Sequence, residues 1–175
     1  MKQKVTLHVP TAQELWFREK CMSDPLTMEY NAGYDVSYEG YHRDTGCIDF
    51  PEYKWQDWAE TKLTNPNFFY AYILDQTTGN FVGYCNFNKN PETGKATMGI
   101  VIKSEFHGKG YMRPAMELLL EKAKEKGVKT LTDTVPETRE HALKVFFDLG
   151  FEKVGEFMSK KFDQPEVVAE IERRI

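Results

Sequence analysis

The feature that most constrains the fold is a change of pattern near residue 103. Before it, three β-rich runs follow one another, Phe69 to Leu74, Phe81 to Phe87 and Ala96 to Ile102, with Gly-bearing turns between them. Short runs of this kind predict an antiparallel meander. After it comes a Gly-bearing loop from Ser104 to Gly110, followed by an apolar stripe at helical spacing from Tyr111 to Lys126. The chain therefore passes from hairpins to a strand–loop–helix unit.

The segments after this helix complete the unit. A strand from Leu131 to Val135 should run parallel to the third strand, through a right-handed crossover. Apolar residues at helical spacing before Gly150 predict a second helix. Val154 to Phe162 is typical of a strand, and Glu166 to Ile175 predicts a short terminal helix.

The first third of the chain is less regular. Val5, Leu7 and Val9 predict a strand, and a capping box at Thr11 and Glu14 predicts a helix to about residue 22. From about 23 to 67 lies a long aromatic loop, with a short helix expected around 54–63. Taken together, residues 1–175 read as a single α+β domain: one mixed, mostly antiparallel sheet flanked by helices.

Composition narrows the classes of function. The 175 residues carry a net charge of −4 without a basic cluster, so nucleic acid is not an expected partner. No apolar stretch reaches membrane-spanning length and the N-terminus has no signal-peptide pattern, so we expect no membrane partner and a cytoplasmic location. The three cysteines fit no zinc spacing, and we expect no metal.

The loop Glu105-Phe106-His107-Gly108-Lys109-Gly110 carries the clearest chemical signal. Glycines allow a tight turn, and amides at the start of a helix can converge on an anionic phosphate. A plain turn between strand and helix is the alternative interpretation.

The spacing of two motifs resembles the GCN5-related N-acetyltransferase (GNAT) family. The family's Gln/Arg-x-x-Gly-x-Gly/Ala hallmark is matched by Glu105-x-x-Gly108-x-Gly110, and a second hallmark by Leu149-Gly150-Phe151. The likeness covers about residues 69–162, with the cofactor half at about 96–162. It implies the acyl-CoA N-acyltransferase fold and acetyl-CoA as cosubstrate.

The resemblance also implies roles for individual positions. Main-chain groups of Ile100, Val101 and Ile102 would pair with the pantetheine arm, and the Ile100 amide would polarise the thioester carbonyl. The pyrophosphate would be held by amides of a loop comprising His107, Gly108, Lys109, Gly110, Tyr111 and Met112. His141 and Lys144 would be outer contacts of the cofactor.

Two positions depart from the family pattern. Glu105 places a carboxylate where the family has Gln or Arg, close to the expected phosphates. Phe146 stands where the family often has a Tyr that protonates the leaving thiolate, so that proton would come from elsewhere.

A base must take a proton from an attacking amine. The resemblance also implies that the strand at 96–102 separates from the strand at 131–135. Asp133 is the first candidate, because its strand lies beside that expected opening and partial burial would raise its pKa. Glu29 and Asp49 in the aromatic loop are the second candidates, and a structural carboxylate remains the alternative for each. Cys85 reads as a buried strand thiol rather than a nucleophile.

The aromatic loop suggests what the acceptor is. Residues 29–57 hold seven carboxylates against two basic side chains, which would suit a cationic amine at the acceptor pocket. We expect direct acetyl transfer from acetyl-CoA to a primary amine of a small molecule or peptide. A non-catalytic acyl-CoA sensor and a partner-binding domain are the alternatives. The first strand's edge and the predicted terminal helix would suit a homodimer.

Overall fold

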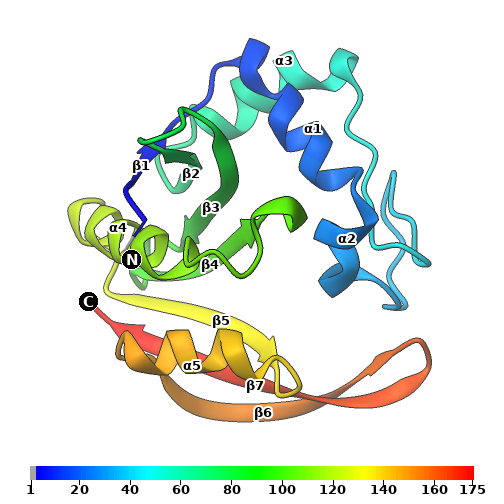
Figure 1. Ribbon diagram of the computed structural model, residues 1–175. Helices are drawn as coiled ribbons and strands as arrows, with labels where there is room; N and C mark the ends of the chain where they lie inside the picture. Colours follow the sequence, from blue (N-terminus) through cyan, green and yellow to red (C-terminus); the bar gives the residue numbers. More distant parts are fainter. Residues whose placement is uncertain (1–2) are drawn as a thin grey trace.

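A computed structural model describes residues 3–175. Within them, one sheet has the strand order β1-β2-β3-β4-β5-β7-β6, and every neighbouring pair is antiparallel except the parallel pair β4–β5 (Figure 1). The strands are β1 (Val5–His8), β2 (Phe68–Asp75), β3 (Phe81–Lys89), β4 (Lys95–Ile102), β5 (Thr130–Pro136), β6 (Glu152–Lys161) and β7 (Gln164–Arg174). The predicted meander and the parallel strand–helix–strand unit are confirmed.

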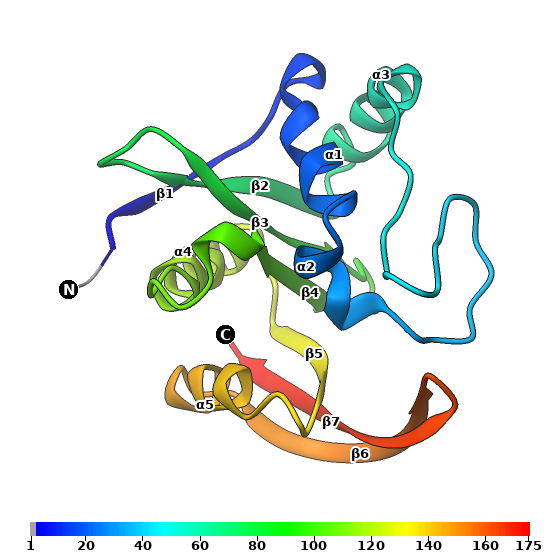
Figure 2. The ribbon, with the colours of Figure 1, turned by 45° about the vertical axis from the view of Figure 1, so that its right-hand side comes forward.

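Helices cover both faces of this sheet because its central strands are apolar on both sides. On one face, Ala71 and Ile73 of β2 join a core cluster with Met116 and Leu119 of α4 (Met112–Glu125), and α5 (Glu140–Asp148) extends it. On the other face, alternate β2 residues such as Tyr72 pack against α1 (Trp16–Met22). Figure 2 shows α4 and α5 on the side of the sheet away from α1. No helix in the described part is long and apolar enough to cross a bilayer.

The predicted capping box at the start of the first helix is present: Thr11 N–H donates to Glu14 Oε1 at 3.0 Å. It opens a short 3-10 turn, η1 (Ala12–Glu14), before α1. The long aromatic loop contains α2 (Pro25–Met28), the short turns η2 (Glu29–Asn31) and η3 (Glu52–Lys54), and α3 (Trp55–Trp58), which continues as η4 (Ala59–Leu63). The short helix expected around 54–63 is therefore confirmed.

The predicted terminal helix at Glu166 to Ile175 is wrong, because this segment forms β7. Val167, Ile171 and Ile175 fit a helical spacing, but β7 pairs with β5 on one side and β6 on the other, and Ile171 is fully buried between them. The hairpin from β6 turns at Phe162 and Asp163, both with positive φ. A turn of that kind usually carries Gly or Asn, so Phe162 and Asp163 did not indicate a hairpin. The terminal helix therefore cannot contribute to a dimer.

The parallel pair is short. Lys95, Ala96 and Thr97 of β4 pair with Thr130, Leu131 and Thr132 of β5. Beyond these residues, β4 and β5 do not pair with each other. Both strands continue past this point, β4 to Ile102 and β5 to Pro136. The strands diverge there (Figures 1 and 2), which leaves one edge of β4 without a neighbouring strand.

Candidate active site

The unpaired edge of β4 is the first element of the site. Lys103 N–H donates to Val82 O and Asn90 N–H donates to Lys95 O, which fixes the ladder with β3. Antiparallel pairs alternate, so odd-numbered residues of β4 direct their N–H and C=O groups to β3 and even-numbered residues direct theirs to the opposite edge. Ile100 is an even-numbered residue three positions beyond Thr97, the last residue of β4 that pairs with β5. Its main-chain groups point into the opening between the strands.

Two neighbouring residues on β4 differ from this arrangement. The main-chain groups of Val101 belong to the ladder with β3, where Val101 faces Tyr84. Ile102 points to the opening, but its carbonyl lies 2.7 Å from Nε2 of His107. Of the three positions expected to pair with a pantetheine arm, Ile100 therefore offers both main-chain groups, Ile102 offers its amide, and Val101 is engaged elsewhere.

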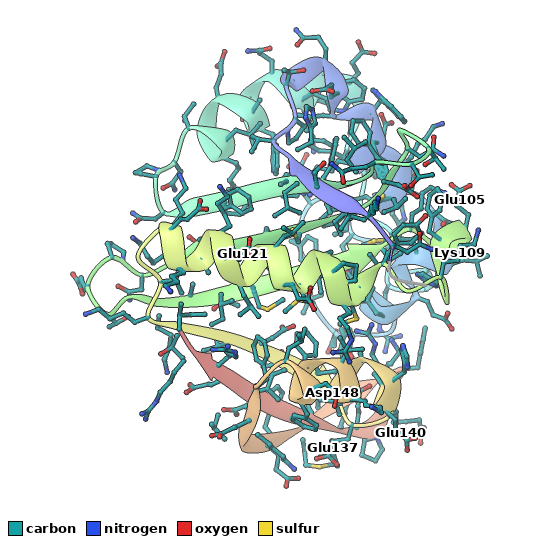
Figure 3. The ribbon with its side chains drawn as sticks, turned by 60° about the vertical axis from the view of Figure 1, so that its left-hand side comes forward. Glu105, Lys109, Glu121, Glu137, Glu140 and Asp148 are labelled. Atoms are coloured by element: carbon teal, nitrogen blue, oxygen red, sulfur yellow. The ribbon has the colours of Figure 1, made fainter. Side chains whose placement is uncertain are left out.

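The loop that enters α4 is the second element. Gly108 and Gly110 have φ of +71° and +81°, which L-residues rarely adopt, and both are exposed. Within residues 3–175, the amides of Gly108, Lys109 and Gly110 donate no main-chain hydrogen bond, whereas the His107 amide donates to Ser104 O. Unpaired donors at a helix N-terminus fit a diphosphate. Tyr111 and Met112 follow at the start of the helix, and Figure 3 shows Lys109 at this end of α4.

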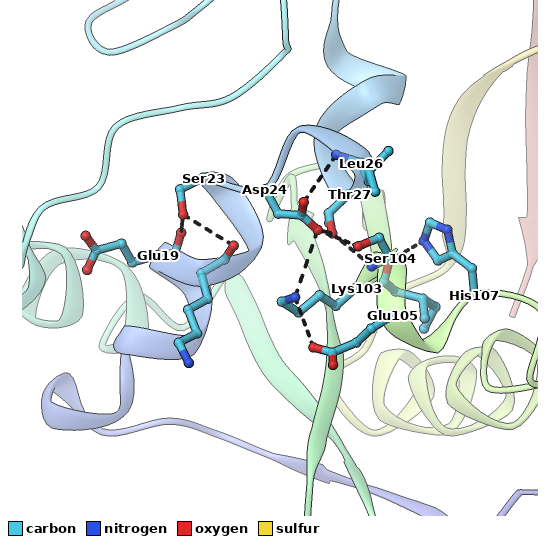
Figure 4. A network of polar contacts seen from close by, with 11 residues as sticks. Glu19, Ser23, Asp24, Leu26, Thr27, Lys103, Ser104, Glu105 and His107 are labelled. Carbon is cyan, nitrogen blue, oxygen red and sulfur yellow. Dashed lines mark hydrogen bonds and ion pairs between the residues drawn. The ribbon is translucent and has the colours of Figure 1, made fainter.

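The carboxylate of Glu105 is neutralised by its neighbour. Lys103 Nζ lies 3.0 Å from Glu105 Oε1 and 3.9 Å from Asp24 Oδ2 (Figure 4). The Glu105 side chain is 60% exposed, so it does not project its charge unpaired toward the loop amides. This departure from the family pattern is therefore compatible with a phosphate nearby.

The same network connects the loop that enters α4 to the helix α2 (Figure 4). Asp24 Oδ2 accepts from Ser104 Oγ and from Thr27 Oγ1, each at 2.5 Å, and Ser104 N–H donates to Thr27 Oγ1 at 2.9 Å. Burial raises the pKa of Asp24, but the hydrogen bonds from Ser104 and Thr27 outweigh it, so the pKa is lowered. Hydrogen bonds thus join the N-terminal end of α2 to the start of the loop that enters α4.

The helix α5 presents His141 and Lys144 to solvent. Lys144 Nζ lies 2.9 Å from Asp148 Oδ2, and the same oxygen lies 2.8 Å from Nη2 of Arg113 on α4. Figure 3 shows Asp148 on the side of α5 that faces α4. Arg113 is a cation in the first turn of α4 that our sequence analysis did not select, although its position directly after Met112 could have indicated it.

Phe146 is buried and packs edge-to-face on Phe151, with ring centroids 5.0 Å apart. The side chain at this position is therefore part of the core, and it carries no group that could protonate a leaving thiolate.

Asp133 lies at the opening between the two strands. It follows Thr132, the last residue of β5 that pairs with β4, and it is half-buried. Burial raises the pKa of Asp133 to about 7, against the lowering effects of a hydrogen bond from Thr134 N–H and the charge of Arg139. A carboxylate with that pKa is half ionised near neutral pH, as a general base requires.

The other two carboxylate candidates have exposed side chains. Asp49 is 63% exposed and pairs with His42 at 2.9 Å. It lines a cavity of about 520 Å³ with residues from α1 and the aromatic loop, none of them from β4 or β5. Glu29 begins η2 with an exposed side chain, while its carbonyl accepts from Lys161 Nζ at 2.9 Å. The structure brings Asp133 and Ile100 to one opening and does not bring Asp49 there.

A half-buried arginine, whose guanidinium lies among aromatic rings, was not expected from the sequence. Arg18 of α1 lies among Phe50, Trp58, Tyr70 and Tyr84. In the sequence it resembles any basic residue on an amphipathic helix, and only the apolar neighbours Phe17 and Cys21 hinted otherwise. Among residues 3–175 there is no cluster of His, Cys, Asp and Glu that could bind a metal ion.

Comparisons with known proteins agree with this geometry. The model of the acetyltransferase (GNAT) family matches residues 33–151. No curated protein sequence matches the chain. Among solved structures, spermidine N-acetyltransferase from Vibrio cholerae in complex with CoA and spermine is similar with a TM-score of 0.79 at 16% identity, over 97% of this chain and 95% of that chain. A single-residue mutant of the spermidine N-acetyltransferase SpeG from Vibrio cholerae gives 0.75 at 15% identity, over 97% and 93%.

At these identities the structural likeness shows the fold, while the family model covers more than half of the chain. The mixed sheet with a parallel pair that opens, the glycine loop before α4 and the matched family model lead to one conclusion. The chain belongs to the GNAT family of acetyltransferases, acyltransferases that take the acetyl group from acetyl-CoA and transfer it to amines.

Proposed function

We propose that the protein transfers the acetyl group directly to a primary amine while both substrates are bound. The observation that carries the proposal is the opening between β4 and β5, which has the free main-chain groups of Ile100 on β4 and the half-buried carboxylate of Asp133 on β5, with the unpaired amides of Gly108 to Gly110 in the loop that follows β4. A phosphate cradle, a main-chain donor and a base along one edge would support this reaction. No covalent enzyme intermediate is needed, and Cys85 is fully buried.

Each residue has a defined part in this reaction. The amides of Gly108, Lys109 and Gly110 bind the diphosphate, and the Ile100 and Ile102 edge holds the amide-bearing arm as an added strand would. The Ile100 N–H donates to the thioester oxygen, where negative charge develops as the amine nitrogen attacks the carbonyl carbon. Asp133 accepts the proton that the amine loses. The C–S bond then breaks, and the thiolate takes its proton from water.

The proposed acceptor is a primary amine. The rest of the acceptor molecule has more than one candidate. A polyamine is one candidate, favoured by the likeness to an enzyme that binds spermine and by the acidic aromatic loop. The seven carboxylates of residues 29–57 are all exposed, however, and Asp49 and Glu39 are paired with His42 and Lys54.

The test compares two carboxamide variants. In Asp133→Asn, release of CoA thiol with an accepted amine should fall about 100-fold or more, the usual loss on removing a general base, while the Kd for CoA by calorimetry stays unchanged. Asp49→Asn is the matched control and should keep full turnover. Equal turnover in Asp133→Asn and wild type would remove Asp133 from the mechanism. Absence of heat with CoA at millimolar concentration would overturn the proposed function itself.

A further inference from the structure

Arg18 is a cation without an anion. Its guanidinium is enclosed between α1, the aromatic loop and the sheet, and no carboxylate of residues 3–175 forms an ion pair with it. Within the described chain, its Nε is the one buried side-chain nitrogen or oxygen that has no hydrogen-bond partner. Buried charges in proteins are normally paired, because an unpaired one loses its hydration without compensation.

The surrounding aromatic rings stabilise the charge of this guanidinium but accept few hydrogen bonds from its N–H groups. Its central carbon lies 4.4 Å from the Trp58 ring centroid, 5.0 Å from that of Phe50 and 5.3 Å from that of Tyr70. Ring faces stabilise a cation, but the N–H donors lie in the guanidinium plane and need acceptors. The one acceptor present is the Tyr70 hydroxyl, at the limiting distance of 3.5 Å from Nη1. A ligand that brings two oxygens in one plane would complete the set.

The position of Arg18 points to the acceptor rather than to the cofactor. Its guanidinium lies 5.9 Å from the Tyr84 ring, and Tyr84 faces Val101 on β4, next to Ile100. Tyr84 and Val101 pack together on the α1 side of the sheet. The helix α4, which the phosphate loop enters, lies on the opposite side. A group held by Arg18 would therefore approach β4 from the side away from α4.

A second arginine links this region to Asp133. Burial raises the pKa of Tyr30, against the lowering effects of Tyr84 and of the charges of Arg139 and Arg18. The Arg139 guanidinium is 5.9 Å from the Tyr30 ring, and its charge also acts on Asp133. The charge of Arg139 therefore acts at both Tyr30 and Asp133.

We propose that Arg18 binds a carboxylate of the acceptor, so that the substrate is an amino carboxylate whose amine reaches the opening between β4 and β5. The inference rests on the proposed function, and it opposes the polyamine candidate at one point: the far end of the acceptor is negative. The planar carboxylate fits the planar guanidinium in a bidentate pair. The aromatic rings around it exclude water and strengthen the pairing.

The experiment uses three amines of one length that differ only in the charge at the far end: 5-aminopentanoate, pentylamine and 1,5-diaminopentane. Release of CoA thiol is followed with acetyl-CoA and each amine, and the α-amino acid 2-aminopentanoate tests a shorter spacing. With the wild-type protein, one of the two amino carboxylates should exceed pentylamine in kcat/KM by at least about tenfold, and 1,5-diaminopentane should be the poorest.

Variants of Arg18 separate charge from packing. Arg18→Met keeps the length of the side chain and should lower kcat/KM for the amino carboxylate about 100-fold, leave pentylamine nearly unchanged, and bring their ratio close to one. Arg18→Lys should restore part of the preference, because it keeps the charge. Lys20→Met, on an exposed face of the same helix, is the matched control and should keep the wild-type ratio. The Kd for CoA should be the same in all four proteins.

The possible failures are distinguishable. If 1,5-diaminopentane is the best wild-type substrate, or if the preference survives in Arg18→Met, the carboxylate assignment is overturned while acetyl transfer stands. If wild-type protein with bound CoA gives no heat with either amino carboxylate, the assignment is also overturned. If CoA itself does not bind, the proposed function fails first. Should Arg18→Met not fold, the wild-type ratios and Arg18→Lys still decide.

Discussion

Replacing Gly110 by Ala isolates the contribution of the loop's backbone. The Cβ that alanine would add has no heavy atom within 4 Å, so no clash arises, but the residue sits at φ +81°. Holding an L-residue in the left-handed region costs about 1–2 kcal/mol. Gly79 provides a matched control in the turn between β2 and β3, because it has φ +76° and equally open surroundings.

The two substitutions should differ in where that cost appears. The Gly79 turn is held by its own N–H, which donates to Asp75 O at 2.8 Å. Gly79→Ala should therefore lose about 1–2 kcal/mol of stability, seen as a decrease in Tm of about 2–8 °C for a chain of this size. At Gly110, the amide has no such bond, and the free loop should relax to negative φ. CoA binding must then restore the strained form, which weakens its Kd about 5–30-fold.

The assay is titration calorimetry with CoA, paired with thermal unfolding of both variants. Gly110→Asn should bind CoA nearly as well as wild type, because Asn tolerates the left-handed region. Wild-type CoA affinity in Gly110→Ala, with the expected loss of Tm in Gly79→Ala, would refute the view that the loop amides hold the diphosphate through this backbone conformation.

Four further predictions follow from individual contacts. The kcat of the wild-type protein should rise with pH through about 7 as Asp133 loses its proton, and Asp133→Asn should lack that limb of the profile. Burial raises the pKa of the Cys85 thiol to about 12, so Ellman's reagent should modify Cys85 only after unfolding. In Gly46→Ala the new Cβ would lie 2.2 Å from Met28 O at φ +78°; circular dichroism on heating should show a Tm loss larger than that of Gly79→Ala. Asp24→Ala removes the acceptor for Ser104 and should increase hydrogen exchange at the amide of Ser104 without abolishing folding.

The elements around the phosphate loop could be predicted because each has a local signal. Glycines marked the turns, and apolar spacing marked α4 and α5. The terminal strand β7 could not be predicted in this way. Val167, Ile171 and Ile175 suit a helix when considered alone, and only pairing with β5 and β6 selects the strand.

The candidate site residues also differ in whether they carry a local sequence signal. Asp133 could be proposed from its place on a strand next to the expected opening, since alternation fixes where a strand residue lies. Arg18 could not, because its burial depends on Phe50 and Trp58, which reach it from a loop without periodicity. The pairing of Glu105 with Lys103 depends likewise on side-chain directions that the sequence does not specify.

The bare edge of β4 has a consequence for how such a protein can change over time. The proposed recognition there uses only the peptide groups of Ile100 and Ile102, and every residue except proline supplies both a main-chain donor and an acceptor. Substitutions that preserve the geometry of β4 leave these main-chain donors and acceptors in place. A cosubstrate site of this kind therefore depends on the backbone and not on particular side chains. That freedom is consistent with a shared architecture at 16% identity. If the proposed acceptor site is correct, the differences between relatives would be concentrated in the few side chains that contact the acceptor, Arg18 among them.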